Sequence, residues 1–262
     1  MSINNPRPVY LSPHLDDAVL SCGGLIYQQA QQGLQPLVIT VFAGAAELRE
    51  LSPFAQQQHS LWGLSADAVA RRRCEDATAL SFIGAEYEHW NYLDCIYRQH
   101  PQSGEFLYAR EAALFGELHD VERVLIDELK RRLEMLFAME TILIYAPLAV
   151  GHHVDHQLVS GAALCLRRHG FHVRFYEDYP YADDPSRLAL ALQQWTAQPH
   201  AYLQPLDAPA VARKISAIGL YRSQLHMLFG REEAVDRRVR SYLLAVGGGQ
   251  GCAERYWKGG AW

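Results

Sequence analysis

Residues 9–24 read VYLSPHLDDAVLSCGG, and they combine a short apolar run, a polar turn and the beginning of a helix-like pattern. The apolar run from Val9 to Leu11 predicts a buried strand. Between Ala18 and Gln32 apolar residues recur with helical spacing, and Gly33 follows at a position where helix ends favour glycine. A strand that leads through a tight turn into a helix predicts the first unit of an α/β fold.

The same alternation continues along the chain. Leu37–Phe42 is a β-branched run typical of a parallel strand buried on both faces, and Thr141–Tyr145 is another. Further strands are expected at Tyr87–Trp90 and Val173–Tyr176, and helices at Ala66–Phe82, Val121–Ala138, His156–His169, Arg187–Trp195 and Ala208–Phe229, the last with a candidate break near Gly219. Strands that alternate with such helices predict a mostly parallel sheet covered on both faces. We expect one domain over residues 1–262, with C-terminal helices over 208–246 packed on it and a flexible tail at Gly247–Gly251.

Composition narrows the classes of function. The 262 residues include 24 basic and 29 acidic side chains, for a net charge of −5. A mildly acidic chain without long Lys/Arg runs does not suit nucleic-acid binding through phosphate neutralisation, so we expect no nucleic-acid partner. The nearest approach to a membrane span, Met135–Val150, is interrupted by Glu140 and Pro147, so no span is expected. The first residues lack the pattern of a secretory signal, which predicts a cytoplasmic protein.

Cysteine and histidine are distributed differently. The five cysteines are scattered and form no C-x-x-C pair, which argues against a disulfide framework and against a thiolate zinc site. Of the 12 histidines, three lie within five residues, at His152, His153 and His156. Because histidine is the commonest metal ligand, this cluster is the first feature of the sequence that needs an explanation.

Two polar clusters, Pro13–Asp17 and Gly151–His156, each follow directly after a predicted strand. Ligands of parallel α/β sheets bind at the carboxyl ends of the strands, so both clusters are expected on one rim. Taken alone, the aspartates of the first cluster could cap a helix, and the histidine pair of the second could simply pack or cap. Together, two imidazoles and one carboxylate make the three-ligand set of a catalytic zinc site, with a fourth position for water. The remaining Asp and His could supply a base and an acid, so the pattern predicts a metal-dependent hydrolase.

At these residues the chain resembles a known family, the PIG-L/LmbE-like zinc-dependent N-acetylglucosaminyl deacetylases. VYLSPHLDDAVLSCGG resembles their His-Pro-Asp-Asp-type motif, and His153-Val-Asp-His156 is similar to their second, His-x-Asp-His motif. Arg72-x-x-Glu75 followed by Gly84 is a third match, and Ser223-Gln224 is a weaker one. The resemblance implies a Rossmann-like three-layer sandwich with a mostly parallel sheet.

The resemblance also implies roles for individual residues. It implies the zinc ligands His14, Asp17 and His156 and the substrate-binding residue Arg72, which would contact sugar hydroxyls or the acetyl-derived product. Asp16 would be the general base. His153 would be the general acid, or an imidazolium that stabilises the oxyanion, with Asp155 as its orienting partner. Two histidines and one carboxylate also accept iron(II) or cobalt(II), so the metal is not fixed by the donor set.

The implied reaction removes an acetyl group from a small N-acetylated amino sugar or its conjugate. An amidase of a thiol-sugar conjugate, or a deacylase for a longer N-acyl group, would use the same site. A nucleotide-binding Rossmann module is disfavoured because Cys22-Gly23-Gly24 is no G-x-G-x-x-G fingerprint and lies inside a predicted helix. We interpret its glycines as allowing close packing of that helix on the sheet. The resemblance further favours a homo-oligomer.

Three features lack an assigned role. Some family members carry a tyrosine of the oxyanion site where this chain has Gly151, so Tyr145 or another group substitutes, or His153 and the metal act without it. His152 has no family role and is expected to be solvated or to lie behind the ligands. The cluster Tyr176–Tyr181 could direct Glu177 or Asp178 to sugar hydroxyls or simply form a turn. Irregular segments at Ala43–Leu64 and Asn91–Ala109 are expected to wall the pocket.

Overall fold

A seven-stranded sheet forms the centre of the computed structural model, which describes residues 6–46, 51–64, 67–195 and 199–259. The strands lie in the order β3-β2-β1-β4-β5-β7-β6. Their bounds are β1 (Arg7–Ser12), β2 (Leu37–Thr40), β3 (Glu86–His89), β4 (Ile142–Pro147), β5 (His172–Tyr176), β6 (His200–Pro205) and β7 (Ala253–Lys258). The first five strands pair in parallel, whereas β7 runs antiparallel to both β5 and β6. The predicted α/β class with a mostly parallel sheet is confirmed.

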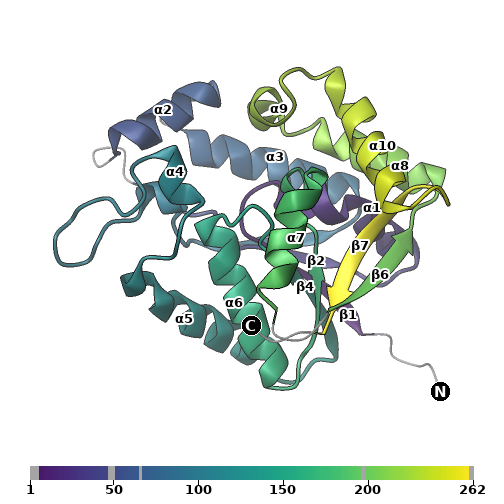
Figure 1. Ribbon diagram of the computed structural model, residues 1–262, viewed down its shortest axis with the longest axis horizontal. Coiled ribbons are helices and arrows are strands. Elements are labelled where there is room, and N and C mark those ends of the chain that lie inside the picture. Colours follow the sequence, from purple (N-terminus) through teal and green to yellow (C-terminus); the bar gives the residue numbers. More distant parts are fainter. Residues whose placement is uncertain (1–5, 47–50, 65–66, 196–198, 260–262) are drawn as a thin grey trace.

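Helices cover both faces of the sheet (Figure 1). Their bounds are α1 (Asp17–Gln31), α2 (Pro53–Leu61), α3 (Ala68–Phe82), α4 (Glu111–Leu114), α5 (Arg123–Leu136), α6 (Val154–Arg168), α7 (Pro185–Gln193), α8 (Ala208–Ile218), α9 (Arg222–Phe229) and α10 (Ala234–Val246). Helices α1, α3, α8 and α10 lie on one face, and α5 and α6 pack together on the other. This is the layered arrangement expected when parallel strands are joined by right-handed crossovers.

The strand order reverses between β1 and β4. From β1 the chain proceeds outward through β2 to β3, and after β4 it proceeds in the opposite direction to β5. In sheets of this type the crevice at the carboxyl ends of the two central strands is where ligands bind. The loop after β1 and the loop after β4 both open at this crevice, so the topology brings the two polar clusters together.

The core strands are buried on both faces because their side chains are apolar in both directions. Val9, Tyr10 and Leu11 of β1 are fully buried, and Ile39 and Ile144 flank Leu11 and Val9 in register on the neighbouring strands. A second, smaller apolar cluster lies under α2 and the segment after β3. It supports the part of the chain that stands above the carboxyl ends of the strands.

The glycines inside α1 serve close packing, as predicted, but against α8 and the segment after β6 as well as against the sheet strand β7. A methyl group on Gly24 would lie 2.5 Å from Leu206, and one on Gly23 would lie 3.2 Å from Lys214. The backbone of α1 therefore approaches its neighbours more closely than a side chain would allow. Among the described residues, none of the helices is long and apolar enough to cross a membrane.

Several predicted elements differ in the structure. The expected helix Ala208–Phe229 is two helices, with the break that Gly219 indicated. The segment around Gly247–Gly251 is a turn rather than the beginning of a flexible tail, because β7 follows it and lies within the sheet. Helix α2 occupies part of the segment Ala43–Leu64, of which 47–50 lie outside the described residues. The predicted helix start at Ala66 also lies outside them.

Candidate metal centre and active site

The turn after β1 presents two adjacent carboxylates in different directions. Asp17 is the first residue of α1, and its Oδ2 accepts a hydrogen bond from the backbone N–H of His14 at 2.8 Å. Asp16 occupies the N-cap position, yet its side chain caps nothing. The Ser12 hydroxyl instead accepts the hydrogen bond from Ala18 N–H. The Asp16 carboxylate is therefore not consumed by the helix end and faces the cavity described below.

The turn after β4 places His153 at the N-cap of α6. The Nδ1 atom of His153 accepts a hydrogen bond from the backbone N–H of Asp155 at 3.2 Å. A neutral imidazole carries one proton, so this bond assigns the proton of His153 to Nε2. Burial, followed by the neighbouring His14, lowers the pKa of His153 well below its ordinary value, which favours the same neutral form.

Asp17, His14 and His156 converge from the two turns. Asp17 Oδ2 lies 3.3 Å from His14 Nδ1 and 3.3 Å from His156 Nε2. Ligand atoms on bonds of about 2.0–2.1 Å in a tetrahedron are separated by about 3.3 Å. These two spacings thus fit a metal held between one carboxylate and two imidazoles.

His153 lies close enough to be considered as another ligand. Its ring and those of His14 and His156 offer nitrogen atoms that lie within 4.8 Å of one another. However, the N-cap bond occupies the lone pair of Nδ1 and leaves Nε2 protonated, so neither nitrogen can donate to a cation. The hydrogen bonding therefore separates His153, a proton donor, from the two histidines that could bind metal.

A buried carboxylate stands behind each of these two histidines. Asp155 Oδ2 lies 2.8 Å from His14 Nε2, and Asp178 Oδ1 lies 2.7 Å from His156 Nδ1. Such contacts fix the ring and leave the opposite nitrogen free for a metal. Asp155 was expected to orient His153, but its carboxylate contacts His14, and only its backbone N–H reaches His153.

Arg98 neutralises Asp155 from the other side. Its Nη1 donates to Asp155 Oδ1 at 2.6 Å, and its Nε and Nη2 donate to Glu122. Burial alone would raise the pKa of Asp155, but the charge of Arg98 and the hydrogen bond from His14 hold it well below its usual range. The chain thus keeps this fully buried carboxylate ionised.

Asp16 has the opposite environment. Burial, and then the charge of Asp17, raise the pKa of Asp16 to about 7. Arg72 is the nearest cation, with Nη2 at 3.8 Å from Asp16 Oδ2 and its guanidinium stacked 4.7 Å from the Trp62 ring. A carboxyl group that titrates near neutrality can accept and return a proton at physiological pH.

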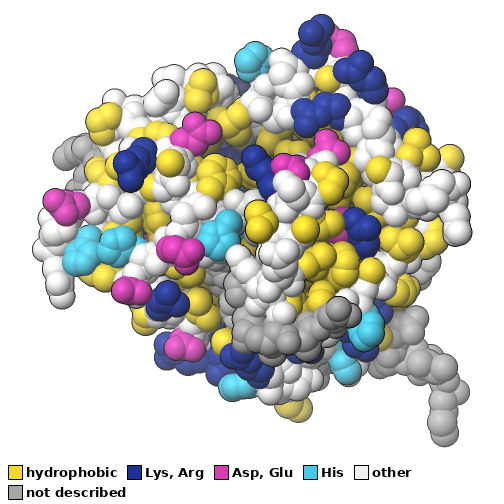
Figure 2. Space-filling model, in the orientation of Figure 1, with side chains coloured by type: hydrophobic (Ala, Val, Ile, Leu, Met, Phe, Trp, Pro, Cys, Tyr) yellow, Lys and Arg dark blue, Asp and Glu magenta, His cyan; other side chains and the backbone are white. Residues whose placement is uncertain are grey.

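The candidate site lies at a cavity of about 250 Å³ that opens between α2 and α9, where Figure 2 shows the surface hollowed. On the same face, acidic, basic and apolar side chains are interspersed. The residues around the cavity include His14, Asp16, Asp17, Trp62, Arg72, Asp94, Phe115, His153, Tyr181, Gln224 and Met227. His156 and Asp155 lie deeper, with 1% and 0% of their surfaces exposed.

The structure thus gathers all seven sequence-predicted site residues around one crevice. Arg72 reaches it from α3, and the adjacent Glu75 binds the backbone N–H and hydroxyl of Ser223 at the start of α9. This contact joins the third family motif, Arg72-x-x-Glu75, to the weaker one, Ser223-Gln224. His152 faces a different cavity, where its ring lies 3.1 Å from the Gln157 amide.

Two residues of the site were missed or given another role by sequence reasoning. Asp178, considered for sugar binding, is 1% exposed and holds His156, while Glu177 binds Tyr242, Arg255 and Trp257. The signal in the sequence that could have placed Asp178 at the site is its position just after β5, at the carboxyl end of the strand. Tyr181 packs on Gly151 so closely that a methyl group there would lie 2.9 Å from its ring.

Tyr181 rather than Tyr145 lies beside the site. The hydroxyl of Tyr145 contacts Gln29 and Arg174, whereas the Tyr181 ring lies 6.1 Å from His156 and lines the cavity. Among the described residues, the Tyr181 hydroxyl has no hydrogen-bond partner. Burial and the charge of Asp17 raise its pKa, so it stays protonated and can donate.

Comparison with known proteins gives the class to which this arrangement belongs. The sequence model of PIG-L, the GlcNAc-PI de-N-acetylases, matches residues 9–166. The chain belongs to this family, as the motifs around His14 and His156 predicted.

Particular relatives are deacetylases. The chain is 30% identical to a 2'-N-acetylparomamine deacetylase of Niallia circulans, over 86% of this chain and 82% of the relative. It is 28% identical to a protein of the same name from Streptomyces fradiae, over 97% and 82%. Among solved structures, the zinc-inhibited form of the teicoplanin deacetylase Orf2 superposes with a TM-score of 0.82 at 32% identity, covering 96% of this chain and 97% of that one. The A40926 pseudoaglycone deacetylase Dbv21 gives 0.75 at 30% identity, covering 96% of each.

Proposed function

We propose that the protein is a metal-dependent N-deacetylase that releases acetate from an N-acetylated amino sugar. The observation that carries the proposal is the spacing of Asp17 Oδ2, which lies 3.3 Å from one nitrogen of His14 and 3.3 Å from one of His156. Asp16 and His153 line the cavity beside these three residues and are not needed as ligands. The relatives named for deacetylation of paromamine and teicoplanin compounds support the same reaction class. Their substrates suggest that the acetylated sugar belongs to an antibiotic or its precursor.

His14, Asp17 and His156 would hold the metal. Zinc suits two imidazoles and one carboxylate with an open position, and iron(II) or cobalt(II) suit the same donors. When bound, such a metal lowers the pKa of its water from 15.7 toward about 7 and polarises the amide carbonyl. Asp155 and Asp178 orient the two histidine ligands from behind.

Asp16 is the proton carrier of the proposed reaction. Its carboxylate takes a proton from the attacking water, and the protonated acid then returns it to the amide nitrogen as the C–N bond breaks. An amine leaves only when its nitrogen is protonated, so this return is required. Acetate and a free amino sugar are the products, and Asp16 ends the cycle ionised.

His153 is proposed as a donor to the oxyanion. Because its Nδ1 accepts the Asp155 N–H, Nε2–H is the available group, and an imidazolium would place two donors against each other at the N-cap. This geometry favours the oxyanion-stabilising role over the general-acid role that the resemblance also allowed. We assign the Tyr181 hydroxyl as a second donor, at the place left open by Gly151.

Arg72 would bind the acetyl-derived product or sugar hydroxyls, as its position in the cavity allows. The Nε atom of Arg72 is buried and has no hydrogen-bond partner in the described part of the chain. Trp62, stacked on the same guanidinium, offers an aromatic face at the cavity wall. A cytoplasmic location and a homo-oligomeric state stay predictions.

The test is acetate release from a panel of N-acetylated amino-sugar glycosides, including an N-acetylated paromamine. We expect release that stops when a chelator removes the metal and returns with added zinc. Asp16→Asn should retain the metal and lose the activity. Equal activity of Asp16→Asn and the unmodified protein, or activity indifferent to the chelator, would refute the proposal. Longer N-acyl substrates in the same panel separate a deacetylase from a general deacylase.

A further inference from the structure

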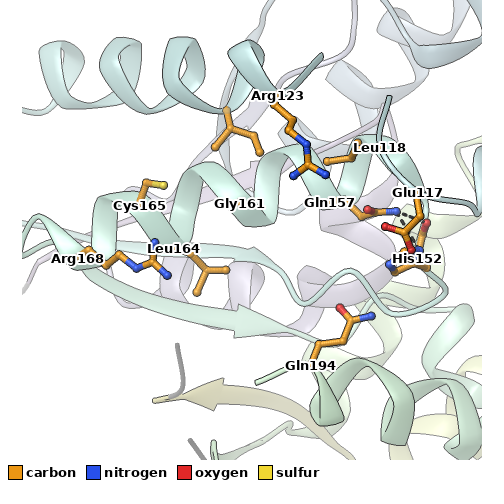
Figure 3. A pocket seen from close by; sticks show the side chains of 11 residues that line it. Glu117, Leu118, Arg123, His152, Gln157, Gly161, Leu164, Cys165, Arg168 and Gln194 are labelled. Carbon is orange, nitrogen blue, oxygen red and sulfur yellow. Dashed lines mark hydrogen bonds between the residues drawn. The ribbon is translucent and has the colours of Figure 1, made fainter. Parts of the chain in front are cut away.

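A cavity of about 660 Å³, larger than the one at the candidate active site, lies along α6 between α5 and α7 (Figure 3). One end of it is bounded by His152, which immediately precedes the N-cap residue of α6. Figure 3 shows the Gln157 side chain reaching from α6 to this end, with its contacts to His152 drawn as dashed lines. The cavity therefore exposes a contact between the helix and the loop that delivers His153.

Gln157 ties three segments together through one amide nitrogen. Its Nε2 donates to the carbonyl oxygen of His152 at 2.7 Å and to that of Gly116 at 2.8 Å, and it lies 3.1 Å from His152 Nδ1. An amide nitrogen has two protons, and both backbone carbonyls are within reach. The side chain thus joins the first turn of α6, the loop after β4 and the segment before α5.

The loop that Gln157 holds has an unfavourable backbone conformation. Ala149 and His152 have φ angles of +62° and +64°, and Gly151 has +88°. Residues with a side chain seldom adopt positive φ, and they do so where the surroundings impose it. At Val150 the surroundings include Asp178, whose Oδ2 accepts the backbone N–H at 2.8 Å. At His152 the amide of Gln157 donates to the backbone carbonyl at 2.7 Å and so fixes its direction.

We propose that Gln157 is a positioning residue for His153. By fixing the carbonyl of His152, it keeps that residue in the left-handed region, which lets His153 cap α6 and direct Nε2–H toward the reacting carbonyl. This inference rests on the proposed function, because it assigns Gln157 to the same reaction. Gln157 itself is not placed in the active-site cavity.

The experiment is a double-mutant cycle in the metal-loaded enzyme with Gln157→Met and His152→Gly. Methionine keeps the length of the side chain and removes both donors. We expect Gln157→Met to lower kcat about tenfold with KM and metal content unchanged, since misplacing a catalytic group by about 1 Å can cost up to 10²-fold. In the His152→Gly background the same substitution should lower kcat less than about threefold, because glycine adopts positive φ without side-chain strain. Gln194→Met, at the same cavity, is the matched control and should match the unmodified enzyme.

Two results would overturn the inference: unchanged kcat in Gln157→Met, or the same loss in both backgrounds. If Gln157→Met does not fold, Gln157→Glu keeps the shape while placing a carboxylate against the carbonyls, and the same cycle applies. An unmodified protein that deacetylates nothing would contradict the proposed function instead. In that case NMR of the His153 ring nitrogens still tests the inference, since Nδ1 should lose its hydrogen bond in Gln157→Met and keep it in Gln194→Met.

Discussion

Replacing Asp178 by asparagine should weaken metal binding without removing any proposed ligand. The carboxylate of Asp178 accepts two hydrogen bonds, from His156 Nδ1 at 2.7 Å and from Val150 N–H at 2.8 Å. An asparagine of the same shape has one oxygen and one NH₂ group, so it can accept only one of the two. Either His156 loses its orienting acceptor or the backbone N–H of Val150 loses its hydrogen bond. At that position the NH₂ group of the asparagine faces another N–H group.

The expected loss follows from the burial of this contact. Asp178 and His156 are each 1% exposed, so water does not replace the missing acceptor. Removing such an orienting partner typically costs 10- to 100-fold in metal affinity, or about 1.4–2.7 kcal/mol. We expect the Asp178→Asn protein to fall in this range, and Asp178→Ala to fall at its upper end because it loses both acceptors.

The assay is a competition between the protein and a chelator of known zinc affinity, followed at constant pH. Glu177→Gln is the matched control, because this neighbouring carboxylate is also buried but binds Arg255 and Tyr242. An Asp178→Asn protein that folds and binds zinc as tightly as the Glu177→Gln control would refute the role of Asp178. The assignment of His156 as a ligand would then rest on its spacing from Asp17 alone.

Three further predictions concern acid–base chemistry, oxyanion binding and stability. In the metal-free protein the pKa of Asp16 is about 7 in the folded state and near 3.8 in the unfolded state, so between these pH values the folded state binds the extra proton. The contribution of Asp16 to the stability of the fold is therefore lost as pH rises toward 7. Asp16→Asn should raise the melting temperature relative to the unmodified protein progressively above pH 4, and a pH-independent difference would contradict the shifted pKa. Tyr181→Phe should lower kcat about 10²-fold with metal content intact. Tyr179→Phe is the control and should leave kcat unchanged, because the Tyr179 hydroxyl is buried away from the cavity. Equal activities of the two variants would exclude the Tyr181 hydroxyl as a donor. Lys214→Met should cost about 3–5 kcal/mol in urea unfolding, since it removes the cation paired with the buried carboxylate of Glu254. The exposed-pair variant Arg240→Ala should cost less than about 1 kcal/mol, and similar losses would refute this ranking.

The sequence predicted the parallel half of the sheet well because its signals are local. Apolar β-branched runs such as Leu37–Phe42 require burial on both faces, and polar turns that follow them must lie on the rim. For this reason the sequence alone predicts that the two motifs lie at one crevice. The family and the reaction class followed from the same residues.

The missed elements carry weak local signals. Strand β7 reads AERYWK and β6 reads HAYLQP, and both mix charged or polar residues with aromatic ones. Their place is set by pairing with each other and with β5, which no local pattern encodes. Helix α2 begins at Pro53 after the N-cap Ser52, yet its glutamine-rich interior hides its amphipathic character.

The partners of the site's carboxylates were harder to predict than the carboxylates themselves. Asp155 lies two residues after His153 but bonds His14, 141 residues away. Which imidazole a buried carboxylate meets depends on how the two turns pack, and sequence proximity is a poor guide to it. Asp178 illustrates the same point, because its partners come from α6 and the loop after β4.

The position of β7 inside the sheet has a consequence for biosynthesis. When the ribosome has released residues up to Pro205, β5 has no neighbour on its outer side, and its unpaired backbone is open to other nascent chains. The edge of β5 stays unpaired until about fifty further residues have emerged and Ala253–Lys258 can pair between β5 and β6. Heterologous expression should then be most prone to inclusion bodies when translation stalls in this interval, and a chaperone that shields strand edges should relieve it.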